Sequence, residues 1–241
     1  MAQYRRFSDA SVSEKLLDSM FLLMIGVAYF FALLHMYYSH EGRDGVPGLS
    51  VDDVMIAYYG SHDQTRLGAA INGPMGANLP SQAAKIEILD WINNGGEEDV
   101  YETRIRPIME DNCIMCHSVQ SGMNIPPLET YNDVVALTET DTGATVPALV
   151  RVSHIHLFGI AFILFFVGRI FLLCEMPKMW KRVAVIVPFA AVLLDIMSWY
   201  VTKIIPGFAY VVVISGGLMG ASLWLQILLS GYQMWFTGKK S

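Results

Sequence analysis

The 241-residue chain is short of charged side chains. Asp, Glu, Lys and Arg make up 16% of it, whereas ordinary soluble domains contain about 25%. Because the apolar residues occur in long runs, this deficit is typical of a membrane protein. The formal net charge is -6, and no basic patch occurs outside the short loops between apolar runs. We therefore expect no nucleic-acid partner.

Cysteine is also scarce, and the three residues present exclude a disulfide scaffold. Internal repeats and low-complexity stretches are absent as well. Cys174 ends an apolar run beside Glu175, and we interpret it as a structural cysteine. The other two form a motif in the stretch "NCIMCHSVQSGMNIPP", where Cys113 and Cys116 are three positions apart and His117 follows directly.

Four long apolar runs each approach the roughly 20 residues that a membrane-spanning helix needs. They cover residues 16–38, 153–173, 183–201 and 208–236. Pro188 interrupts the third run, but a neighbouring helix can satisfy the carbonyl that a proline frees, so we still expect a helix there. Gly216 and Gly220 give the fourth run a small-residue face suited to close helix packing. The sequence predicts an all-α protein with a four-helix transmembrane bundle.

The basic residues indicate the orientation. They precede the first run, link the second to the third and end the chain: Arg5, Arg6, Lys15, Lys178, Lys181, Arg182, Lys239 and Lys240. With four spans all of them lie on one side, which the positive-inside rule makes the cytoplasm. Segment 39–152, with 17 acidic and 6 basic residues, then lies outside. We expect a bacterial inner-membrane protein with a cytoplasmic N-terminus (1–15), an uncleaved first span (16–38), a periplasmic segment (39–152) and three further spans before a cytoplasmic C-terminus (153–241).

The Cys-x-x-Cys-His motif is the attachment site of a c-type haem. The thiols of Cys113 and Cys116 add across the porphyrin vinyl groups, and His117 becomes the proximal iron ligand. A redox dithiol and a zinc site are the alternatives. A dithiol usually begins a helix in a βαβ context, which this sequence lacks, and a zinc site needs a second ligand pair. The outward topology agrees with haem attachment, which takes place on that side of the membrane.

The segment around the motif resembles the c-type cytochrome family. "YETRIRPIMEDNCIMCH" (101–117) is similar to the helix that leads into the haem motif, and "INGPMGANLPSQAAKIEILDWINNGG" (71–96) to the methionine loop and closing helix. Here the methionine stretch precedes the cysteines, so the resemblance is to a permuted cytochrome c fold. It implies a periplasmic cytochrome c-like helical domain inserted between the first and second spans. It also implies Met75 as the distal iron ligand, which raises the reduction potential relative to a second histidine.

Other distal ligands stay open at this point. Met123 is close to the motif in sequence, His40 and His62 are further choices, and an iron without a distal protein ligand is the last alternative.

Three histidines lie at the outer ends of the first two spans. His35, His154 and His156 could bind a haem b between helices, a metal ion or a quinone head. The ordinary reading is that they hydrogen-bond lipid headgroups or backbone. Asp195, inside the third span, either takes protons from a quinol or bonds neighbouring hydroxyl groups. Arg169 lies near the inner end of the second span, and we expect it to extend to the cytoplasmic surface.

The sequence therefore favours a monohaem c-type cytochrome that transfers single electrons at the periplasmic face. Its expected partners are the lipid membrane, other subunits of a respiratory complex and a soluble periplasmic electron carrier. The alternative is a quinol-oxidising subunit with a second cofactor near His35, His156 and Asp195. A structural subunit whose haem is vestigial is a third reading.

Overall fold

The computed structural model describes residues 5–123 and 125–237. Its described part is helical and contains no β-strand, which confirms the all-α prediction; a single isolated bridge joins Thr65 and Thr140. The chain divides into two compact units, Met1–Met36 with Thr145–Ser241 and Tyr37–Ala144. Lys239 and Lys240, which belong to the predicted basic C-terminus, lie outside the described residues.

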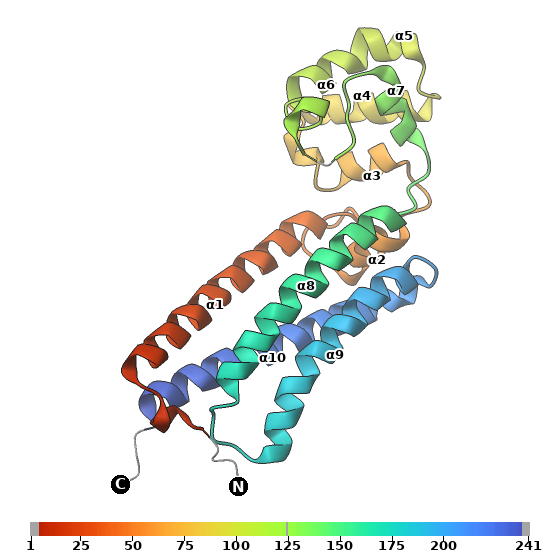
Figure 1. The fold of residues 1–241 in the computed structure, drawn as a ribbon. Coiled ribbons are helices and arrows are strands. Elements are labelled where there is room, and N and C mark those ends of the chain that lie inside the picture. The colour runs from red at the N-terminus through yellow and green to blue at the C-terminus, as the bar shows by residue number, and fades with distance from the viewer. Residues whose placement is uncertain (1–4, 124, 238–241) are drawn as a thin grey trace. The chain divides into compact units, whose positions relative to one another are not determined.

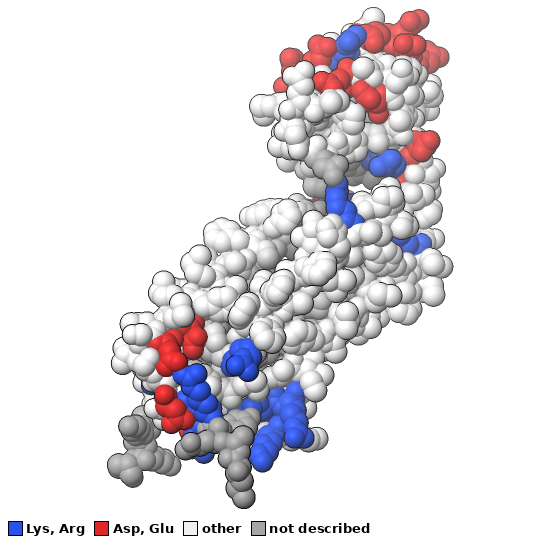
Figure 2. Space-filling model, in the orientation of Figure 1, with Lys and Arg blue, Asp and Glu red and all other residues white. Residues whose placement is uncertain are grey.

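The first unit is a bundle of four long helices, with a short 3₁₀ turn before the first and another before the last (Figure 1). They are α1 (Val12–His40), α8 (Val146–Phe171), α9 (Lys178–Thr202) and α10 (Ala209–Phe236), with η1 (Phe7–Asp9) and η6 (Pro206–Phe208). All four are long and apolar enough to cross a membrane, which confirms the four predicted spans. Figure 2 shows charged residues gathered at the end of the bundle where α1 begins and α10 ends, while the visible helix flanks carry few.

Two of the helices begin several residues before their apolar runs. The hydroxyl of Thr145 accepts a hydrogen bond from the amide of Ala148, and Pro147 lies in the first turn of α8. Both residue types favour a helix start at these positions. Helix α9 begins at Lys178, directly after Pro177, and has no side-chain cap. Capping by Thr145 therefore starts α8 in polar sequence that hydropathy alone assigns to a loop.

Helix α9 continues through Pro188 because a neighbour satisfies the freed carbonyl. Proline has no amide hydrogen, so the carbonyl of Ala184, four residues earlier, loses its helical partner. The side-chain amide of Gln226 on α10 donates to that oxygen at 2.7 Å. Gln226 is 1% exposed. This contact confirms the expectation that Pro188 does not end the third span.

Glycines allow the bundle helices to approach closely. A Cβ at Gly220 on α10 would collide with the hydroxyl of Tyr29 on α1, and a Cβ at Gly26 would lie 3.4 Å from the Trp224 ring. Gly216 instead lies beside Asp195 on α9, whose Oδ1 would be 3.9 Å from an added Cβ. The two glycines of the predicted small-residue face thus contact two different helices.

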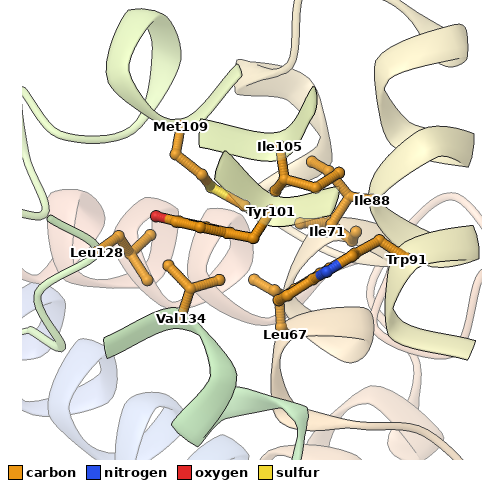
Figure 3. Close-up of a cluster of buried hydrophobic side chains, with 9 residues drawn as sticks. All are labelled: Leu67, Ile71, Ile88, Trp91, Tyr101, Ile105, Met109, Leu128 and Val134. Atoms are coloured by element: carbon orange, nitrogen blue, oxygen red, sulfur yellow. The ribbon is translucent and has the colours of Figure 1, made fainter. Parts of the chain in front are cut away.

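The second unit consists of short helices. These are α2 (Val51–Tyr59), α3 (Arg66–Asn72), η2 (Gly76–Asn78), α4 (Gln82–Asn93), α5 (Glu98–Val100), η3 (Tyr101–Ile105, a π-helical turn), α6 (Arg106–Asn112), η4 (Val119–Ser121), α7 (Tyr131–Val135) and η5 (Ala136–Thr138). One apolar core joins α3, α4, η3, α6 and α7 (Figure 3). Its fully buried members are Leu67, Ile71, Ile88, Trp91, Tyr101, Ile105, Met109, Leu128 and Val134.

The last residues of this unit are joined by backbone contacts to the region between α2 and α3. The amide of Ala144 donates to the carbonyl of Ala57 at 2.9 Å, and that of Asp141 donates to the carbonyl of Gln64 at 2.8 Å. Gly60 and Gly143 both have positive φ angles, and a Cβ at Gly60 would lie 2.3 Å from the carbonyl oxygen of Asp141. Only glycine fits so close an approach. The segment that leads into α8 is therefore anchored to the helices at the start of the unit.

Candidate functional site

The Cys-x-x-Cys-His motif follows the helical stretch formed by α5, η3 and α6. Buried Tyr101, Ile105 and Met109 recur every four residues of this stretch, so they share the face that packs into the core. The helix ends at Cys113, whose amide donates to the carbonyl of Met109 at 2.8 Å. The amide of Ile114 donates to the same oxygen at 3.1 Å. The core therefore fixes where the motif begins.

The motif itself forms one tight turn. The amides of Cys116 and His117 both donate to the carbonyl of Cys113, at 3.1 and 2.9 Å. Both cysteines are free thiols and partly buried, and Cys113 packs against the core. Burial, together with the neighbouring Cys116, raises the pKa of the Cys113 thiol above its ordinary value of 9.0. Met115, between the cysteines, is 88% exposed.

The imidazole of His117 is oriented by a backbone carbonyl. Its Nδ1 lies 2.7 Å from the oxygen of Pro126. A carbonyl oxygen only accepts hydrogen bonds, so Nδ1 carries the proton and Nε2 keeps its lone pair. The amide of buried Leu128 donates to the carbonyl of His117 at 2.9 Å. The segment after the motif therefore holds both the ring and the backbone of the histidine, in the way that outer hydrogen bonds orient metal-binding histidines.

Met75, the predicted distal ligand, lies between α3 and η2 in the same unit. Its amide donates to the carbonyl of Ala70 at 2.9 Å, and its side chain is 41% exposed. A Cβ on the next residue, Gly76, would lie 2.5 Å from the carbonyl oxygen of Ile71. The glycine lets the methionine loop lie directly on α3. The assignment of Met75 to the iron stays a prediction.

The alternative distal ligands differ in their surroundings. Met123 lies just after η4 and is exposed. The Nε2 of His62 lies 3.1 Å from the carbonyl of Tyr59, so this nitrogen is a donor and is not available to a metal. The His40 ring lies beside Tyr58, with 6.5 Å between ring centroids. These contacts do not decide among the ligands.

The hydroxyl of Tyr101 is a feature that the sequence did not predict. Tyr101 is fully buried, yet its hydroxyl has no hydrogen-bond partner among the described residues. Figure 3 shows the hydroxyl directed toward Leu128, between Met109 and Val134. The backbone of Met109 is hydrogen-bonded to Cys113, and the backbone of Leu128 is hydrogen-bonded to His117. A buried polar group without a partner costs about 1–3 kcal/mol, and this one lies among residues that hold the motif.

The histidines at the bundle end are not arranged as a three-ligand metal site. His35, His154 and His156 all have exposed side chains, and within residues 5–123 and 125–237 no group of three or more His, Cys, Asp or Glu could hold a metal ion. The Nδ1 of His156 bonds the carbonyl of Val152 at 3.0 Å, and its ring packs edge-on against Trp199. A haem held by two of these histidines stays a prediction.

Asp195 belongs to a polar cluster inside the bundle. The hydroxyl of Ser215 on α10 lies 3.5 Å from its Oδ1 and 2.5 Å from the carbonyl of Val211. A serine hydroxyl has one hydrogen, and the shorter contact with the carbonyl takes it. The hydroxyls of Ser153 on α8 and Tyr200 on α9 lie 2.9 Å apart.

The comparisons with known proteins concern the C-terminal part of the chain. A family described as a transmembrane helical domain matches residues 140–241, the region of α8, α9 and α10. The chain is a multi-pass membrane protein. No curated protein and no solved structure matches it. The family match does not include the Cys-x-x-Cys-His motif, so the chemistry of the motif has to be argued from its own residues.

Proposed function

We propose that this membrane protein is a c-type cytochrome that carries one covalent haem on Cys113, Cys116 and His117 and transfers single electrons. The orientation of His117 is the observation that carries the proposal. Its Nδ1 proton is fixed on the Pro126 carbonyl, and the remaining nitrogen is the one that can bind iron. A redox dithiol or a structural turn has no need of an imidazole held in this tautomer directly after the second cysteine.

The residues around the motif fit the chemistry of attachment. Cys113 and Cys116 are unpaired thiols one turn apart. Each would hold the porphyrin through a thioether formed by addition of its S–H across a vinyl group, a reaction that consumes no oxidant. When bound, the haem supplies an iron that cycles between ferric and ferrous states.

The surface of the motif loop supports an electron-transfer role. Its apolar side chains Met115, Val119, Met123 and Ile125 are exposed, although such residues are usually buried. Exposed apolar side chains beside a redox centre are suited to transient binding of a second electron carrier, because a complex with a small interface dissociates quickly. The acidic character of this outer segment favours a basic partner by electrostatic steering.

The location follows from the same proposal. Covalent haem attachment and the positive-inside rule together place the unit Tyr37–Ala144 on the periplasmic side of a bacterial inner membrane, with both termini in the cytoplasm. The large exposed apolar area of α1 fits lipid or further membrane subunits. We propose that the protein works as an electron-transfer subunit of a respiratory complex.

Expression of the full chain with a haem-attachment system tests the proposal. We expect a coloured protein whose mass exceeds that of the polypeptide by one haem, and a reversible one-electron step in a redox titration. Cys113→Ser combined with Cys116→Ser should abolish covalent haem, whereas Cys174→Ser should retain it. A colourless product with free thiols and the bare polypeptide mass would contradict the proposal, and a haem that does not cycle would leave only a structural role.

A separate variant tests the distal ligand. Met75→Ala should lower the midpoint potential and remove the sulfur-to-iron charge-transfer band, because thioether ligation raises the potential. Met123→Ala is the matched control and should leave both unchanged. Survival of the band in Met75→Ala would assign the ligand elsewhere.

Quinol oxidation is a second candidate, supported by the polar cluster of the bundle. The carboxylate of Asp195, beside the Ser215 hydroxyl, could take a proton from a quinol, and the His156 ring lies against Trp199. A pyridine haemochrome spectrum with both b-type and c-type bands, together with quinol-dependent reduction that Asp195→Asn abolishes, would support it. A purely c-type spectrum with no quinol-dependent reduction would leave the electron-relay role alone.

A further inference from the structure

A groove lies between the first turns of α1 and the last turns of α8. It has a volume of about 730 Å³. Most of its lining is apolar, including Leu17 and Phe21 of α1 and Phe166 and Ile170 of α8. The rings of Phe21 and Phe166 meet edge to face with centroids 6.0 Å apart. The groove is therefore largely apolar and lies between two membrane-spanning helices.

The lining of the groove also includes three charged residues, namely Arg5, Asp18 and Arg169. Arg5 forms an ion pair with Glu14. Arg169 is exposed and makes no hydrogen bond or ion pair with any residue of the described ranges 5–123 and 125–237. The ammonium of Lys181 donates to the carbonyl of Leu172, another lining residue, at 3.0 Å. The Arg169 guanidinium, which has no ion-pair partner among the described residues, therefore lies beside the apolar groove, and the Lys181 ammonium is a second cation near it.

The wider charge balance at this end of the bundle is also positive. Residues 5–22 and 166–182 contain seven Lys and Arg and four Asp and Glu. A guanidinium is well matched to a phosphate, which it can bind through two parallel N–H groups. Lys and Arg at a membrane surface attract anionic lipids. Charge and shape therefore both match a molecule with a phosphate head and apolar chains.

We propose that this groove binds an anionic phospholipid, of which phosphatidylglycerol is the type that fits best. The phosphate binds Arg169, an acyl chain lies along Phe21, Phe166 and Ile170, and the carboxylate of Asp18 accepts a hydrogen bond from a glycerol hydroxyl of the head. Phosphatidylcholine has no such hydroxyl and no net charge. The lipid joins α1 to α8 at the membrane surface. The inference is independent of the haem.

Native mass spectrometry of the purified full chain in detergent tests this site. Dioleoylphosphatidylglycerol, dioleoylphosphatidylcholine and dioleoylglycerol are added at equal concentrations. We expect retention of phosphatidylglycerol above the other two. Arg169→Gln should reduce that preference by about fivefold, the factor that corresponds to roughly 1 kcal/mol per surface cation. Arg182→Gln removes an exposed arginine at the same end that does not line the groove and should leave the preference unchanged.

Several outcomes would overturn the proposal. Equal retention of the three lipids would show a non-specific apolar groove, and equal losses in both variants would show a diffuse surface charge. A dimer that excludes phosphatidylglycerol would assign the groove to a second copy of the chain. Thermal unfolding of both variants without added lipid checks that neither substitution changes the fold.

Discussion

The hydrogen bond between Gln226 and Ala184 offers a sharp test of how the bundle tolerates Pro188. Gln226→Leu removes the donor while roughly keeping the side-chain volume. The carbonyl of Ala184 is then left without a partner inside the bundle, which costs about 1–3 kcal/mol. The Oε1 of Gln226 has no hydrogen-bond partner among the described residues, so its removal offsets part of that loss. We expect a net destabilisation of about 1 kcal/mol, within the range measured for hydrogen bonds between membrane helices.

The same substitution should be nearly neutral once Pro188 is replaced. Pro188→Ala restores an amide hydrogen four residues after Ala184, and that amide satisfies the carbonyl within α9. A double-mutant cycle over Pro188→Ala and Gln226→Leu should therefore give a coupling energy of about 1 kcal/mol. Reversible unfolding in sodium dodecyl sulfate, followed by circular dichroism, measures the free energy of unfolding of each variant.

A second glutamine of α10 provides the control. Gln233 accepts from the amide of Glu175 at 2.6 Å and donates to its carbonyl at 3.1 Å, far from Pro188 in sequence. Gln233→Leu should destabilise the bundle equally with and without Pro188→Ala. If Gln226→Leu also costs the same in both backgrounds, the glutamine does not act on the carbonyl freed by the proline, and this account of α9 is wrong.

Three further predictions follow from the structure. Gly220→Ala should destabilise the bundle by about 1–3 kcal/mol in the dodecyl sulfate unfolding assay, because the new methyl group collides with Tyr29. Gly217→Ala is the control and should be tolerated, because no atom lies within 4 Å of the added methyl group. Tyr101→Phe should stabilise the haem-free protein by about 1 kcal/mol in urea unfolding, since it removes a buried hydroxyl without a partner, and a loss of stability would reveal a hidden partner. In the haem-free protein Cys113 should react with iodoacetamide more slowly when folded than when unfolded in urea. Because its pKa is raised, the Cys113 thiol stays protonated in the folded protein at a pH where it ionises in the unfolded protein. The free energy of unfolding therefore falls as the pH rises above 9.0, the ordinary pKa of the thiol. Equal alkylation rates for the folded and unfolded protein at every pH would contradict the argument from burial.

Hydropathy predicted the existence of the four membrane helices but not their ends. Helix α8 starts at Val146, seven residues before the predicted span. The sequence held the signal, because Thr145 and Pro147 are good helix starters, but these residues precede the apolar run. The existence of a membrane helix is indicated by hydropathy averaged over a long run of residues, whereas the position of its end depends on one or two side chains.

The contacts that matter most for the candidate site could not be read from the sequence. Pro126 lies nine residues after His117, and no periodicity indicates that its carbonyl meets the imidazole. The Cys-x-x-Cys-His spacing is a local motif, so haem attachment could be hypothesised from the sequence alone, and it stays a prediction. The orientation of His117 depends instead on how a loop without regular structure folds back onto the motif. In the same way Gln226 and Ala184 pair only because α9 and α10 have one particular rotation about their axes.

The unit Tyr37–Ala144 is held together by its own contacts. Backbone bonds between residues 57–66 and 139–144, with Gly60 and Gly143 in close contact, anchor its last residues to the region between α2 and α3. Its apolar core is built from residues of this unit, and a transmembrane family matches the region that begins at residue 140. If the unit is a permuted cytochrome c fold, as we propose, the order in which the methionine loop precedes the haem motif has a simple physical basis. Helix α4 and the helical stretch Glu98–Asn112 pack through Ile88, Trp91, Tyr101 and Ile105, and this packing is the same whichever helix comes first in the chain.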